Sequence, residues 1–139
     1  MIAALLLTLL AAQSEPPLRI ALITPYPQMV PPGLARFERE HGRSRIDLEL
    51  VTPNSKPARL ERAQIIAFVH NSTVFTPEQK QALQRAAARG ALVTASFPDL
   101  VEQRMGLQAE TAISLKIDEY WKNGGAENIA VFFALLYNA

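Results

Sequence analysis

The sequence predicts an α/β fold: an open, parallel, flavodoxin- or Rossmann-like sheet of about four strands, with flanking helices and a C-terminal helical hairpin. Three observations predict it. Short apolar β-rich runs recur along the chain, as in "LRIALITP" and "ALVTASFP". A capped helix separates two of these runs, which makes a right-handed β-α-β unit the default. The 139 residues, 49% hydrophobic and 19% charged, suit one globular domain.

The first half of the chain predicts strand, helix and strand. "LRIALITP" is an apolar strand of the parallel type. "PPGLARFEREHG" sets Leu34, Phe37 and His41 on one helical face, and Gly42 can end that helix. "RIDLELVTP" alternates apolar and acidic residues, which predicts a strand at the edge of the sheet.

The second half predicts the centre of the sheet and one more strand. The polar stretch from Asn54 to Arg62 is expected to connect two strands without a helix or strand of its own. The continuous apolar run at 65–69 that follows is typical of a strand buried on both faces. Thr76 and Gln79 form a predicted capping box for the next helix, and Gly90 ends it. "ALVTASFP" is the following strand.

The last forty residues are predicted to be mostly helical. "PDLVEQRMG" is one short helix and "AETAISLKIDEYWKN" is a longer one. The pair Gly124 and Gly125 breaks the chain, and a strongly apolar helix follows.

Composition and motifs exclude several classes of function. The chain has 14 Lys and Arg against 13 Asp and Glu, so its overall charge draws it to neither nucleic acid nor anionic lipid. The arginines at 36–45 alternate with glutamates, which is typical of a solvated helix end. The sequence has no cysteine and no dinucleotide, phosphate-loop or nucleophile-elbow motif. Its two histidines lack the spacing of a zinc site.

Residues 1–14 are predicted to be a signal peptide. The apolar run at 2–12 is too short to span a bilayer, and Ala12 and Ser14 are small residues of the kind that a signal peptidase selects. The mature domain would then be residues 15–139, exported to the periplasm or secreted, with no stable membrane span after cleavage. The alternatives are a buried first helix or an uncleaved anchor, which Pro16 and Pro17 would separate from the domain.

Polar residues follow the predicted strands, where open α/β sheets bind ligands. His70 stands out because its imidazole can act as a base, a ligand or a hydrogen-bond donor. The alternative is that these loops are polar only because they face water. The candidate ligand-binding residues are Thr24, Tyr26, His70, Asn71, Ser72, Ser96 and Asp99.

The stretch "YWKNGGAENI" has a structural interpretation and also a resemblance. Glu127 falls in the first turn of the last helix, where its charge meets the helix dipole, and Asn128 can bond nearby backbone. An aromatic helix end, then GG-x-EN and an apolar helix, resembles the N-terminal region of the cobaltochelatase large subunit (CobN type) and is similar to magnesium chelatase large subunits. The matching residues are Tyr120, Trp121, Gly124, Gly125, Glu127 and Asn128.

This resemblance implies a relative of the first domain of much longer chains. Most of the body that would house chelation in those chains is absent from this sequence. We expect an accessory or binding module for a tetrapyrrole or corrinoid in cobalamin metabolism, not a complete chelatase, with no catalytic residue and no metal site. The apolar C-terminal helix is expected to be covered by the core of the domain or by a partner protein, and no nucleic acid is expected. Two alternatives stay open: a small hydrolase-like enzyme that uses His70, Ser96 and Asp99, or a truncated chelatase fragment.

Overall fold

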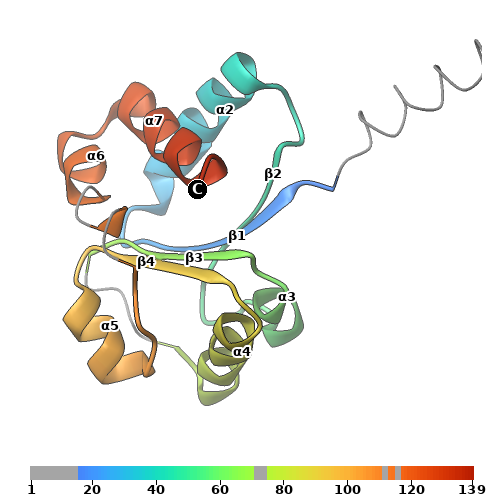
Figure 1. Ribbon diagram of the computed structural model, residues 1–139. Helices are drawn as coiled ribbons and strands as arrows, with labels where there is room; N and C mark the ends of the chain where they lie inside the picture. Colours follow the sequence, from blue (N-terminus) through green and yellow to red (C-terminus); the bar gives the residue numbers. More distant parts are fainter. Residues whose placement is uncertain (1–15, 71–74, 111–112, 115–116) are drawn as a thin grey trace, which may run out of the picture.

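A computed structural model describes residues 16–70, 75–110, 113–114 and 117–139. Its centre is one sheet of four parallel strands in the order β2-β1-β3-β4 (Figure 1). The strands are β1 (Leu18–Ile23), β2 (Ile46–Leu50), β3 (Ile65–Phe68) and β4 (Leu92–Ala95). The predicted fold class is therefore confirmed, with β2 at an edge and β3 inside the sheet.

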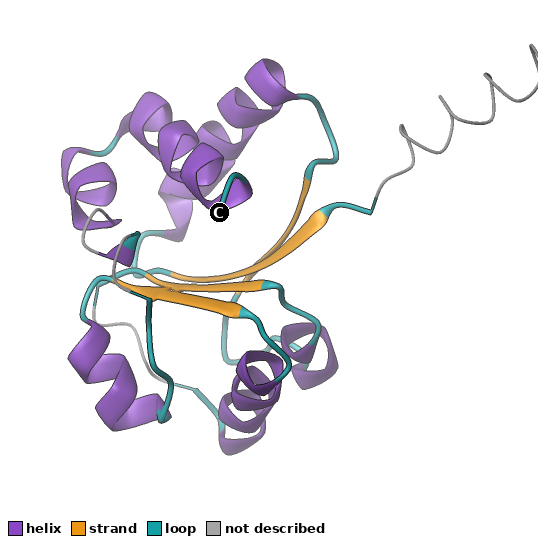
Figure 2. Ribbon diagram, in the orientation of Figure 1, coloured by secondary structure: helices purple, strands orange, loops and turns teal. Residues whose placement is uncertain are grey.

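Helices cover both faces of the sheet (Figure 2). They are the 3-10 helix η1 (Pro27–Met29), α2 (Val30–His41), α3 (Pro57–Glu61), α4 (Pro77–Ala88), α5 (Pro98–Met105), α6 (Ile117–Asn123) and α7 (Gly125–Tyr137). The predicted capping box of α4 is present, because Gln79 N donates to Thr76 Oγ1 and Thr76 N donates to Gln79 Oε1, both at 3.2 Å. Among the described residues, no helix combines the length and the apolar character that crossing a membrane requires.

Helix α3 lies in the stretch that was predicted to have no structure of its own. Pro57 occupies its first turn and Leu60 is fully buried, which anchors this single turn to the sheet. On its exposed side, Arg59 forms ion pairs with Asp47 and Glu49 of β2. The bond to Glu49, followed by the charge of Asp47, raises the pKa of Arg59. Helix α3 thus covers the acidic face of the edge strand β2. The polar composition of residues 54–62 gave no sign of this helix in the sequence.

The helix predicted over residues 109–123 is also wrong at Ala109 and Glu110, which are not helical, and the structure describes α6 from Ile117. Glu110 N donates to Val93 O at 2.8 Å, and Ala95 N donates to Ser114 Oγ at 3.0 Å. Strand β4 would otherwise present unpaired backbone groups at the edge of the sheet. Satisfying those groups outweighs the helical propensity of this segment.

The sheet separates two cores. On one face, α2, α6 and α7 enclose a cluster that includes Phe37, Phe132 and Phe133 (Figure 1). On the other, α3, α4 and α5 cover a cluster that includes Phe68 and Leu83. Helix α7 buries most of its apolar side chains against its own chain, although Val131 remains 45% exposed. The expected coverage by the core is therefore confirmed, and the alternative that a partner protein covers this helix stays a prediction.

Candidate functional site

The strand order reverses between β1 and β3, because the chain passes from β1 to β2 on one side and then returns to β3 on the other. In open α/β sheets, the carboxyl ends of the strands leave a crevice at such a reversal. Two of the predicted residues meet there: Tyr26, after β1, and His70, after β3. Their rings form an edge-to-face pair with centroids 5.2 Å apart.

Local hydrogen bonds fix both residues. Tyr26 N donates to Thr24 Oγ1 at 3.0 Å, which closes a tight turn after β1. His70 N donates to Ser96 Oγ at 2.8 Å, so the end of β4 fixes the end of β3. The backbone of His70 is left-handed, with φ of 56°, a conformation in which histidine is enriched over most other residues. Thr24 and Ser96 therefore hold the backbone of Tyr26 and His70 in place.

A cleft of about 430 Å³ opens beside this ring pair, within the range of known ligand sites. It joins the strand ends to the turn between α6 and α7. Its lining residues are Tyr26, Met29, His70, Trp121, Lys122 and Gly124. The structure thus brings part of the predicted strand-end set together with part of the glycine motif, two groups that the sequence analysis treated separately.

Two residues of the cleft were not among the predicted site residues. Met29 lies in η1, and its Cε would be 3.2 Å from a Cβ placed on Gly124, so the missing side chain lets the methionine lie against the turn. Lys122 is exposed and stands between Trp121 and the glycines. Its place inside the motif, between Trp121 and Gly124, was the signal available in the sequence.

Trp121 forms the inner wall of the cleft. It is 2% exposed and packs edge to face on Phe132, with ring centroids 5.4 Å apart. Its Nε1 is buried and has no hydrogen-bond partner among the described residues. Aromatic rings, a thioether and a single ammonium group are suited to a flat, largely apolar ligand with an anionic substituent.

The rest of the GG-x-EN motif holds the turn together. Gly124 and Gly125 have φ of 64° and 81°, as predicted for a reversal between two helices. Asn128 Nδ2 donates to Gly124 O at 2.8 Å, and Glu127 lies exposed in the first turn of α7. Tyr120 packs against the core around α7.

We expect Asn128→Ala to lower the free energy of unfolding by roughly 0.5–1.5 kcal/mol, because it removes one partly buried hydrogen bond. Chemical denaturation checks this value. Glu127→Gln should leave stability nearly unchanged, since that carboxylate is exposed. Unchanged stability in Asn128→Ala, together with weaker ligand binding, would contradict the structural role of Asn128.

The remaining candidates lie elsewhere. Asp99, in the first turn of α5, lines a separate shallow hollow with Phe97, Leu100 and Gln103. Asn71 and Ser72 lie outside the described residues.

The hydroxyl of Ser96 accepts the hydrogen bond from His70 N described above, which gives Ser96 a structural role. The hydrolase hypothesis therefore gains no support from these positions. Among the described residues, no group of three metal-ligating side chains is present.

Comparison with protein-family models, with curated proteins and with solved structures finds no match for this chain.

Proposed function

We propose that this chain is an exported accessory or binding module, related to the N-terminal region of the cobaltochelatase large subunit, and that its cleft binds a tetrapyrrole such as a corrinoid. The observation that carries the proposal is the position of Trp121 and Gly124. These residues of the motif line the same cleft as Tyr26 and His70, at the point where the strand order reverses. The apolar run at 2–12 supports export.

The chemistry of the cleft suits such a ligand. A tetrapyrrole is a flat macrocycle with a large apolar face and polar groups at its rim. Tyr26 is 39% exposed, so its ring is available to stack on a planar face. Lys122 offers an ammonium group to a rim carboxylate, and imidazole is a common axial ligand of a metal held in a macrocycle. His70 is therefore the residue that we assign to the metal of a metallated ligand.

Fluorescence titration tests this proposal. Trp121 is the only tryptophan, so adding cobinamide or protoporphyrin IX to the full chain should quench its emission in a saturable way. Tyr26→Ala should weaken binding by about tenfold, the loss expected for one stacked ring. Phe97→Ala is the matched control, because Phe97 is an aromatic residue with 46% exposure that lies outside the cleft. Absence of saturable quenching, or equal losses in the two variants, would contradict the proposal.

A second comparison tests the role of His70. His70→Ala should weaken binding of an iron or cobalt porphyrin but leave binding of the metal-free porphyrin unchanged. A metal-dependent change in the visible absorption spectrum provides the readout. Equal weakening for both ligands would mean that His70 shapes the cleft without contacting a metal.

A further inference from the structure

An arginine lies at or shortly before the start of every strand. Arg19 is the second residue of β1, Arg43 and Arg45 precede β2, Arg62 precedes β3 and Arg89 precedes β4. Because the four strands are parallel, their amino ends meet at one edge of the sheet, opposite the ligand cleft. We call these five arginines the basic edge.

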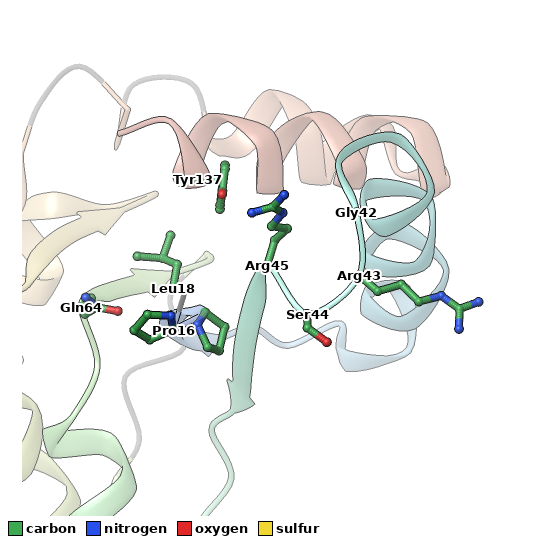
Figure 3. Close-up of a pocket in the computed structure, with 9 residues that line it drawn as sticks. Pro16, Leu18, Gly42, Arg43, Ser44, Arg45, Gln64 and Tyr137 are labelled. Carbon is green, nitrogen blue, oxygen red and sulfur yellow. The ribbon is translucent and has the colours of Figure 1, made fainter. Parts of the chain in front are cut away.

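Two neighbouring hollows open at this edge. The larger, of about 540 Å³, includes Arg43 and Arg45, and the smaller, of about 420 Å³, includes Arg19, Arg62 and Arg89. Gln64 lines both hollows, so they adjoin. Figure 3 shows the guanidinium of Arg45 directed toward Tyr137, while Arg43 points away from the larger hollow. The basic edge is therefore a broad surface rather than a closed pocket.

The charge of this edge is poorly balanced. Among the described residues, five arginines line the two hollows, but Glu61 is the only acidic residue that does so. Glu61 is already engaged by Arg85 at 2.9 Å and by Arg89 at 3.3 Å. Arg45 and Arg62 are exposed, and neither forms an ion pair with a described carboxylate. A nearly neutral chain thus carries a strongly positive edge.

The apolar leader of the chain enters the domain at this same edge. Pro16, Pro17 and Leu18 line the larger hollow, directly after the sequence that holds the apolar run at 2–12. Stable attachment to a membrane generally takes two signals, such as one apolar anchor and a basic patch. The basic edge lies where the domain joins the sequence that holds the apolar run, and this proposal takes that run to be retained as an uncleaved anchor.

We propose that the basic edge docks the domain on a bilayer containing anionic phospholipids. Arginine suits this partner because its guanidinium forms paired hydrogen bonds with phosphate oxygens. A position beside an apolar leader favours lipid over nucleic acid as the source of phosphate. This proposal does not depend on the ligand cleft, which lies at the opposite edge of the sheet and would stay open to solvent.

Vesicle sedimentation with the full chain tests the docking surface. At low salt, we expect the chain to partition more strongly into vesicles of phosphatidylcholine and phosphatidylglycerol than into phosphatidylcholine alone, and added salt should reduce the difference. The double variant Arg45→Gln/Arg62→Gln should lower this partition by roughly 10- to 30-fold. Both side chains are exposed, so the variant should melt at the temperature of the parent chain.

The control is Lys56→Gln/Lys80→Gln, which removes the same charge near the carboxyl edge, just before α3 and in the first turn of α4. Its partition should match that of the parent chain. Equal binding to both vesicle types, or equal losses in the two double variants, would overturn the proposal. Tighter binding to duplex DNA would identify a nucleic acid instead. Release by inorganic phosphate at constant ionic strength would identify a site for the free anion.

Discussion

Gly33→Leu is expected to destabilise the domain by about 3 kcal/mol, at the upper end of the cost of overpacking a core. A Cβ at position 33 would lie 2.3 Å from Ile129 Cγ2 and 2.5 Å from Ile129 Cβ. Ile129 is fully buried and its Cβ is fixed to the backbone, so rotation of the side chain cannot relieve the contact with the Cβ. Helices α2 and α7 would have to separate. Urea denaturation followed by circular dichroism measures the loss.

Ala35→Leu is the matched control, because Ala35 is an exposed position of the same helix. It should change stability by less than about 0.5 kcal/mol. The contact itself is tested by combining Gly33→Ala with Ile129→Ala, which should cost less than the sum of the two single changes, by about 1 kcal/mol or more. Strict additivity would show that the two residues do not compete for space.

Gly124→Val is expected to cost about 2–3 kcal/mol. Gly124 has φ of 64° and ψ of −165°, a conformation that is essentially confined to glycine and that a β-branched side chain makes still less favourable. The nearby Met29 Cε can shift, so the backbone supplies most of the cost. Thermal unfolding measures the change.

Ala126→Val is the comparison for Gly124→Val, since it adds the same side chain two residues later, within α7. Its cost should be at most about 0.7 kcal/mol, the difference in helix propensity. Equal costs at the two positions would contradict the role of the glycine backbone. Because Gly124 also lines the cleft, the variant should in addition weaken binding in the fluorescence titration.

The strands and the capped helix α4 were predictable because the local pattern of apolar and polar residues, and the capping residues, determine them. Continuous apolar character identified β3 as internal, and alternation identified β2 as an edge. Helix α3 was missed because its stability comes from Leu60 and from ion pairs with a neighbouring strand, not from its own periodicity. The helix predicted over 109–123 failed at Glu110 for a similar reason, since β4 supplies the hydrogen-bond partners of Glu110 and Ser114.

The site was predictable only in part. The rule for strand ends identified Tyr26 and His70, and the motif identified Trp121 and Gly124. Nothing in the sequence showed that these pairs share one cleft, because their contact depends on how α6 and α7 pack over the sheet. The basic edge was missed because its arginines are widely separated in the sequence and converge only when the parallel strands align.

The pairing of α2 with α7 also sets the order in which the domain can be completed. These helices are separated by most of the sequence, yet they enclose the same core. The core on this face of the sheet therefore stays incomplete until residues 125–137 have been synthesised, and contacts between such distant segments form slowly. This late closure would suit the export that we propose, because it keeps the polypeptide open during synthesis, the state in which a chain can be threaded across a membrane before it folds.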